Sequence, residues 1–298
     1  MRIIFILILF FVFSACGSGN KSDDQAFIES LESGDKKTAI DEELISGILQ
    51  QIPSPLEISL MLKESGNKYN SDFLNSPDNY GKYNTNYKKA LNLGVYGTDL
   101  GYTNIYEKNA DGIKYLSKIK SMADELNIGQ YFDIQTIGRL AANSRNLDSL
   151  LMMTTKNFNT INSYLQTQGR SNLSVLLLTG GWVEAMNIVC NVASMGVDHP
   201  ELRETIGEQK IVLEQIILLF SFFQDSDENM ASLLKDLKEL ETAFKEVNIT
   251  YTYKESSVEI VNGVAVVKDN STTTITITKQ DIENIKNVTG SIRTKIIS

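Results

Sequence analysis

The chain has 298 residues, of which 42% are hydrophobic, 8% aromatic and 22% charged, and its formal net charge is −9. This composition is typical of a globular protein and argues against disorder and against a membrane protein with many spans. The acidic balance also argues against nucleic-acid binding. Because His199 is the single histidine and Cys16 and Cys190 are the two cysteines, we expect no catalytic residue of these types, no metal site and no cofactor.

Residues 1–15 predict a secretory signal peptide. A positive charge precedes the apolar run 3–13, which is shorter than the roughly 20 residues of a permanent transmembrane helix. The small residues Ser14 and Ala15 stand directly before Cys16, an order that resembles a bacterial lipobox. We therefore predict that Cys16 is lipidated and anchors the protein to a membrane, on its periplasmic or its cell-surface side. The alternative is an ordinary signal peptide followed by an unrelated cysteine.

Residues 16–37 are predicted to form an acidic, lipidated tether. Acidic residues outnumber basic ones across 17–50, and the Gly/Ser-rich residues 17–20 are typical of a flexible spacer. Residues 21–24 resemble the acidic surface-export signal of Bacteroidota lipoproteins. They are equally consistent with a solvated linker, so both interpretations stay open.

Residues 38–248 are predicted to form a helical body. An apolar stripe at helical spacing over 40–52 stops at Pro53, and Ser54 and Pro55 then give a start signal for the next helix. Further helical stripes cover residues 147–165 and 230–247, and a long helix is expected over 173–194. These patterns predict about ten helices joined mostly by short loops, in a multi-helix bundle or an irregular array of helical hairpins.

After Val247 the apolar period changes from helical to alternating, which predicts β-strands. Asn262-Gly263 is a strong signal for a two-residue hairpin, and Asp269-Asn270 predicts a second turn. Thr278 and Asp281 are expected to cap a last helix. The predicted fold is therefore mainly α (α+β), with a small antiparallel β-meander and a final helix over residues 249–298, both packed on the body.

Glycines at helical spacing form one candidate site. Gly94, Gly97 and Gly101 lie on one face of a predicted helix, where each glycine costs about 1 kcal/mol relative to alanine. Either a close contact between helices or the approach of a ligand to the backbone would compensate for this cost.

Tyrosine is concentrated in one region of the chain. Nine of the twelve tyrosines lie between residues 69 and 131, accompanied by many asparagines, a combination that suits a surface for a protein or a glycan. Tyr80 and Tyr83 are the predicted members of this ligand or partner surface, whereas Tyr87 and Tyr102 fall on an apolar stripe and are expected in the core.

Trp182, the single tryptophan, follows Gly180 and Gly181 within the predicted helix 173–194. It is a third candidate member of the ligand or partner surface, because it could line a pocket beside Glu184. The alternative is a kink or a tight helix crossing, with Trp182 filling the core.

Three stretches together, 52–57, 88–96 and 180–184, resemble an uncharacterised family of Bacteroidota lipoproteins. The resemblance implies a predominantly helical protein attached to the outer membrane, without an assigned activity and without catalytic residues to carry over.

We predict a lipid-anchored, non-enzymatic helical protein of the outer membrane that binds a protein partner or a glycan. The alternative is a carboxylate-dependent hydrolase that acts on polymers of the cell envelope. An open pocket with two carboxyl groups roughly 5–9 Å apart and a raised pKa would favour the hydrolase.

Overall fold

A computed structural model describes most of the chain, with these ranges: 43–50, 52, 58, 61–62, 65–131, 147–195, 199–225, 228–261 and 264–298. Side chains are described in the same ranges except for 147–155, 158, 261 and 264. The predicted signal peptide 1–15, the lipidation site Cys16 and the tether 16–37 lie outside the described residues.

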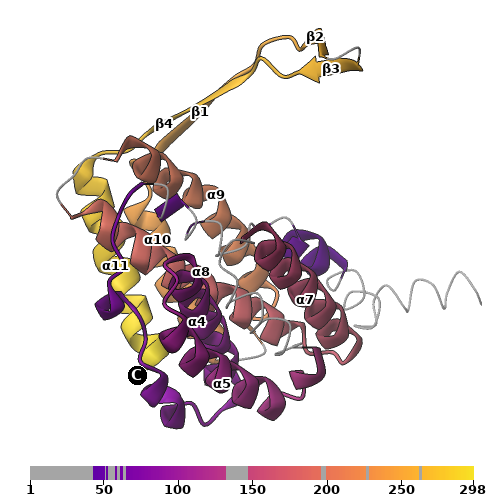
Figure 1. The fold of residues 1–298 in the computed structure, drawn as a ribbon, viewed down its shortest axis with the longest axis vertical. Coiled ribbons are helices and arrows are strands. Elements are labelled where there is room, and N and C mark those ends of the chain that lie inside the picture. Colours follow the sequence, from indigo (N-terminus) through magenta and orange to yellow (C-terminus); the bar gives the residue numbers. More distant parts are fainter. Residues whose placement is uncertain are drawn as a thin grey trace, which may run out of the picture. The chain divides into compact units, whose positions relative to one another are not determined.

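Helices dominate residues 44–298, which form one compact unit. The α-helices are α4 (Asn86–Ile105), α5 (Asn109–Glu125), α7 (Leu147–Thr167), α8 (Ser171–Ala193), α9 (Pro200–Ser221), α10 (Glu228–Ala243) and α11 (Lys279–Ile297), as Figure 1 shows. Short 3-10 helices are η1 (Ser71–Phe73), η2 (Pro77–Lys82) and η3 (Gly129–Tyr131). The strands are β1 (Asn248–Thr252), β2 (Ser257–Val261), β3 (Val264–Lys268) and β4 (Thr272–Thr276). The prediction of a mainly helical protein with C-terminal antiparallel strands and a final helix is confirmed.

The central helix is α8, which packs against α4, α7, α9 and α11. Its sequence is apolar on nearly every side, as expected for a helix that neighbours surround completely. Among the described helices it is the one long and apolar enough to cross a membrane, but 94% of its most apolar window is buried within the protein. Its hydropathy is therefore explained by its place in the core.

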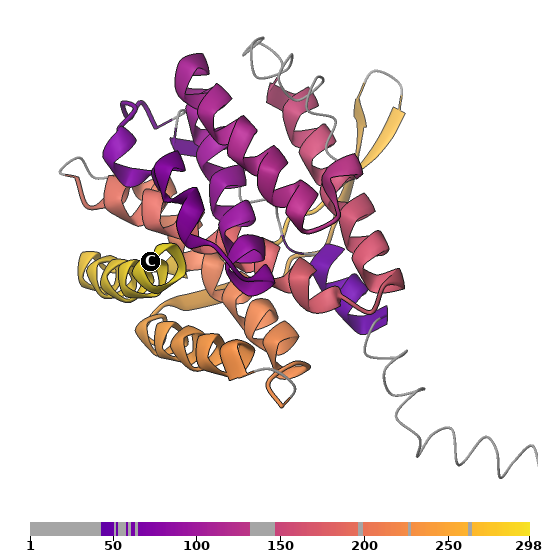
Figure 2. The same cartoon turned by 90° about the horizontal axis from the view of Figure 1, so that it is seen from below.

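Two pairs of packed helices lie beside α8. Helices α4 and α5 pack side by side, and so do α10 and α11, the orange and yellow helices of Figure 2. The predicted apolar stripe of α10 is confirmed, because Met230, Leu237 and Leu240 are all fully buried. The predicted cap of α11 is also confirmed, since Thr278 and Asp281 form a complete capping box.

The strands pair differently from the predicted meander. β1 pairs with β4, and β2 pairs with β3, so the four strands form one long two-stranded ribbon. The Asp269-Asn270 turn prediction is wrong, because β3 and β4 follow each other along the same edge of this ribbon. Instead, Asp269 accepts a hydrogen bond from the Ser271 amide (2.9 Å), and Asn270 donates one to the Glu255 carbonyl (2.8 Å). These polar side chains hold the irregular junction between the two paired halves.

The base of the ribbon packs on α9, whereas its far end extends away from the helices (Figure 1). Gly207 of α9 leaves room for Ile275 of β4, because a Cβ at position 207 would lie 2.4 Å from Ile275 Cγ2. Lys210 adds a hydrogen bond to the Val247 carbonyl at 2.7 Å. We define the tip hairpin as β2 and β3; contrary to the expectation that the strands pack on the body, its described side chains are predominantly exposed.

Candidate functional site

Helices α4 and α8 cross at van der Waals contact of their backbones. A Cβ at Gly94 would lie 2.0 Å from the Leu177 carbonyl oxygen, and one at Gly180 would lie 2.0 Å from the Leu91 carbonyl oxygen. The predicted close helix contact is therefore confirmed for Gly94. Gly97 lies on the exposed side of α4 with open space around it, so it has no part in this crossing.

Beside this crossing lies an ion pair whose acid is fully buried and whose arginine side chain is 15% exposed. Glu184 of α8 is 0% exposed, and Arg293 of α11 binds it through two hydrogen bonds, with Nε at 2.5 Å from Oε2 and Nη2 at 2.7 Å from Oε1. Nη2 also donates to the Phe73 carbonyl at 2.9 Å. Burial lowers the pKa of Arg293, but the Glu184 carboxylate outweighs this effect and raises it. The pair therefore joins α8 to α11 and to the segment before α4.

A second buried carboxyl group, that of Asp99 on α4, adjoins the ion pair. Burial, followed by the charge of Glu184 and a hydrogen bond between the two side chains, holds the pKa of Asp99 well above its usual range. Asp99 Oδ2 accepts a hydrogen bond from the Asn75 amide at 3.2 Å, whereas Oδ1 receives no donor from the described residues. Both facts favour a proton on the Asp99 carboxyl group, which would let Oδ1 donate to Glu184.

With a proton on Asp99, the three groups carry one negative and one positive charge, and of the three only the Arg293 side chain retains some exposure. A protonated acid beside an ionised one is a pattern that carboxylate hydrolases use. However, both carboxyl groups are 0% exposed, so a polymer cannot reach them in this conformation. The accessible carboxyl pocket expected for the hydrolase is not what Asp99 and Glu184 form.

Tyrosines surround this cluster and fasten the irregular segment before α4. Tyr115 donates to the Asn75 carbonyl (3.0 Å), Tyr96 donates to the Ser76 carbonyl (2.9 Å), and Tyr83 accepts from the Asn75 amide group (2.9 Å). Tyr83 is only 2% exposed, so its prediction as a surface residue is wrong. Its ring packs on the edge of Tyr96, and its hydroxyl group satisfies a buried polar side chain.

Tyr80 is half-buried. Its hydroxyl group donates to Glu125, and the ammonium group of Lys118 lies 5.0 Å from the centre of its ring. Lys89 forms an ion pair with the same Glu125 at 2.6 Å. These contacts hold η2 against α4 and α5, so Tyr80 has a structural role whether or not a ligand reaches it.

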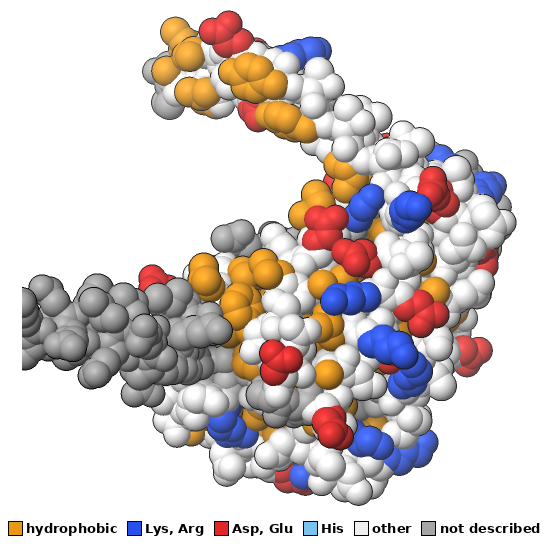
Figure 3. Space-filling view, turned by 180° about the vertical axis from the view of Figure 1, so that it is seen from behind, with side chains coloured by type: hydrophobic (Ala, Val, Ile, Leu, Met, Phe, Trp, Pro, Cys, Tyr) orange, Lys and Arg blue, Asp and Glu red, His pale blue; other side chains and the backbone are white. Residues whose placement is uncertain are grey.

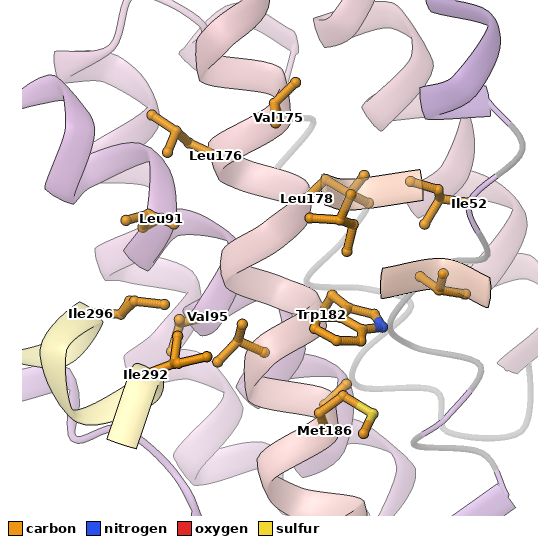
Figure 4. Close-up of a cluster of buried hydrophobic side chains, with 14 of the residues drawn as sticks. Ile52, Leu91, Val95, Val175, Leu176, Leu178, Trp182, Met186, Ile292 and Ile296 are labelled. Atoms are coloured by element: carbon orange, nitrogen blue, oxygen red, sulfur yellow. The ribbon is translucent and has the colours of Figure 1, made fainter. Parts of the chain in front are cut away.

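Trp182 lies in the core, with 1% of its surface exposed. Its indole N–H donates to Gln209 Oε1 of α9 at 3.0 Å. Figure 4 shows Trp182 and Met186 on one side of α8, with Leu91 and Ile292 on the other. The prediction that Trp182 belongs to a ligand surface is therefore wrong, and the alternative of a tight crossing with Trp182 in the core is confirmed.

Cys190 is buried in the same helix, as predicted, and burial raises the pKa of its thiol to about 12. The described residues contain no group of His, Cys, Asp and Glu side chains arranged to hold a metal ion.

Sequence analysis did not find Asp99 and Arg293. A signal for the acids was present: Glu184 is the single charged residue of α8, and Asp99 is the single one of α4 after Lys89. An isolated acid in a helix that is otherwise buried indicates a partner elsewhere in the fold.

A different kind of site is found on the ribbon. Of eleven exposed large hydrophobic residues among the described side chains, six lie there: Tyr251, Tyr253, Val258, Ile260, Val266 and Val267. Figure 3 shows hydrophobic side chains along the ribbon and on part of the helical body. Sequence analysis missed this surface because it assigned the strands to a meander packed on the helices.

The two faces of the tip hairpin differ in character. In the observed register Val258 is opposite Val267, and Ile260 is opposite Ala265, so one face carries four apolar side chains and no charge. We call these four residues the apolar face. Of these, Val258, Ile260 and Val267 are 66%, 78% and 71% exposed, respectively. The opposite face carries the Glu259–Lys268 ion pair at 3.3 Å.

Asp99→Asn is expected to make the stability of the protein less sensitive to a rise in pH above the usual pKa of aspartate. A raised pKa in the folded state gives stability that is complete below the usual pKa of aspartate and is lost as the pH rises through the raised value. Over that window the ionisation of Asp99 lowers the free energy of unfolding of the wild type by about 1.4 kcal/mol per pH unit. The substituted amide keeps the hydrogen bonds of the protonated acid and cannot ionise. Urea unfolding from pH 4 to 9 measures the difference, which should grow with pH; parallel curves for the two proteins would contradict the shared proton.

Comparisons with protein-family models, curated proteins and solved structures find no match to this chain.

Proposed function

We propose that this chain is a lipid-anchored, non-enzymatic helical protein of the outer membrane that binds a protein partner through its β-ribbon. The observation that carries the proposal is the concentration of exposed apolar side chains on the ribbon, above all on the apolar face of the tip hairpin. Contiguous apolar surface of this kind is typical of interaction sites, because leaving it in water costs about 25 cal/mol per Å².

A protein partner suits the ribbon better than a lipid bilayer or a glycan. Each half of the ribbon has two strands, so each strand has an edge of backbone groups without a strand partner. Such edges are costly in hydrocarbon, whereas a protein can cover or extend them. A glycan surface was expected from the tyrosines, but Tyr83, Tyr96, Tyr102 and Tyr115 are buried.

The ribbon proposal predicts that charges on the apolar face abolish partner binding. Val258→Asp with Ile260→Asp is expected to remove a partner that crosslinks to wild type in native membranes, because binding would bury both carboxylates. The matched control is Glu259→Gln with Lys268→Gln, which alters the opposite face of the same hairpin and should retain the partner. Equal recovery with both variants would rule out the apolar face as the binding surface.

The lipid anchor is proposed from Cys16, which precedes the described residues. Cys16→Ala is expected to abolish labelling by a fatty-acid probe and to release the protein from membranes, because the acyl chains supply the attachment. Cys190→Ala is the control and should retain the label, since that thiol is buried in α8. Unchanged membrane association of the Cys16 variant would refute the anchor.

The alternative function, a carboxylate-dependent hydrolase of envelope polymers, has one supporting feature: the Asp99 carboxyl group beside Glu184, whose pKa is raised by burial and by the charge of Glu184. Catalysis there requires α4, α8 and α11 to separate. A hydrolytic activity on cell-wall material that Asp99→Asn removes, in a variant that stays folded, would favour it over the binding protein.

A further inference from the structure

The tip hairpin has two open edges, one on β2 and one on β3. Isolated two-stranded hairpins are marginally stable in water, and three or more strands are needed for independent stability. Since its described side chains are predominantly exposed, the hairpin receives little support from the helical body. The addition of strands at an open edge would supply the missing stability.

The β2 edge is unsuitable for symmetric pairing with a second copy. Two antiparallel β2 strands related by a two-fold axis overlap completely when the central residue, Glu259, lies opposite itself. Like charges directly opposite each other destabilise a sheet. The side chain of Glu259 is also occupied by Lys268 within its own hairpin.

The β3 edge has the opposite character. Its central residue is Val266, so complete overlap of two β3 strands places Val266 opposite Val266 of the second copy. In the same hypothetical register, Ala265 of one copy would lie opposite Val267 of the other, and Val264 opposite Lys268, as follows from the order of residues in β3. Two of these three kinds of pair are wholly apolar, and none brings two like charges together.

We propose that the tip hairpin binds a second copy of this chain through β3. This inference rests on the proposed function in one respect only, because both treat the ribbon as an interaction surface. The product is a four-stranded antiparallel sheet in which the two β3 strands are central and the two β2 strands form the edges. Its closed two-fold symmetry makes the contact isologous. The apolar faces of both hairpins then lie on one side of the sheet, which doubles the surface offered to the partner protein.

A cysteine at the two-fold axis tests the register directly. Directly opposite residues have Cα atoms about 4.5–5.5 Å apart, within the range that a disulfide spans. Val266→Cys in the full chain should therefore give a covalent dimer when native membranes are treated with copper phenanthroline as the oxidant. Val258→Cys, on the outer strand of the same hairpin, is the control and should remain largely uncrosslinked. Equal crosslinking at both positions, or none at position 266, would overturn the pairing.

Two double variants separate strand pairing from general damage to the hairpin. Ala265→Lys with Val267→Glu places opposite charges across the interface, whereas Ala265→Lys with Val267→Lys places like charges there. Both change the same two positions, so they share any loss of local stability. Sedimentation of the purified protein should show a dimer dissociation constant at least about tenfold higher for the second variant than for the first, equivalent to about 1.4 kcal/mol. Equal dissociation constants would exclude this register.

The results of these experiments also distinguish a failure of the self-pairing inference from a failure of the proposed binding function. A monomer at all concentrations, with a foreign partner still lost on Val258→Asp and Ile260→Asp, would refute the dimer and keep the binding function. A dimer with the expected charge dependence, but without any foreign partner, would support the inference and refute that function. Crosslinking of Val266→Cys to a different protein alone would assign the β3 edge to that partner and overturn self-pairing.

Discussion

Replacing Arg293 by methionine is expected to lower the free energy of unfolding by about 3–5 kcal/mol, because removal of one partner leaves the other charge buried and unpaired. Glu184 is 0% exposed and receives both guanidinium hydrogen bonds, so it has no water to replace them. The Phe73 carbonyl loses its donor as well. Urea unfolding of the purified protein at neutral pH measures the loss.

The same helix supplies a matched control. Lys295 of α11 forms an ion pair with Asp236 at 2.7 Å, but its side chain is 60% exposed. Lys295→Met should therefore cost at most about 1 kcal/mol. A further variant, Arg293→Met with Glu184→Gln, removes both charges and should recover part of the stability lost in the single variant. A single variant as stable as the Lys295 control would show that the buried pair contributes little.

Gly180→Ala is expected to destabilise the protein by about 3 kcal/mol, the upper end of the range for an overfilled core. The added methyl group meets the Leu91 carbonyl oxygen at 2.0 Å, and a backbone atom cannot rotate away as a side chain can. Helices α4 and α8 must therefore separate along their crossing. Such a shift would also disturb the hydrogen bond that Thr98 donates to the Gly181 carbonyl at 3.0 Å.

Gly97→Ala tests this explanation, because it is expected to have the opposite effect on the free energy of unfolding. Gly97 lies in α4, one turn beyond Gly94, but on the exposed side with open space around it. Alanine there should raise the free energy of unfolding by about 0.5–1 kcal/mol, because it restricts the unfolded chain without a clash. Thermal unfolding of both variants gives the comparison. Destabilisation by both would indicate a general intolerance of α4 and α8 to alanine.

The helices, their caps and the tight crossing at Gly94 could be predicted because they depend on local patterns. The capping box of Thr278 and Asp281 spans one helical turn, and the stripe of α10 repeats within a single helix. The burial of Tyr83 and Trp182 could not be predicted, because an aromatic side chain with a polar group suits an exposed position and a buried, hydrogen-bonded position equally well. Their hydrogen-bond partners, Asn75 and Gln209, decide between the two, and these lie on other segments.

The pairing of the buried Glu184 with Arg293 could not be predicted because the two lie far apart in sequence, and the ribbon could not be predicted because strand register is not local. Arg293 follows Glu184 by 109 residues, so no local spacing joins them. The ribbon was predicted as a meander because Asp and Asn side chains are common in turns. Here Asp269 accepts a turn-type hydrogen bond from the Ser271 amide, whereas Asn270 donates across the ribbon to the Glu255 carbonyl, and the chain continues in the same direction.

The distance between Glu184 and Arg293 also has a consequence for biosynthesis. At about 5–20 residues per second, the ribosome needs roughly 5–20 s to add the 109 residues that separate the acid from its arginine. Until then α8 carries a carboxylate that cannot be buried without cost, and the core positions that Ile292 and Ile296 fill remain open. The central helix α8 is therefore the most apolar of the described helices, and it stays partly uncovered until α11 has been made.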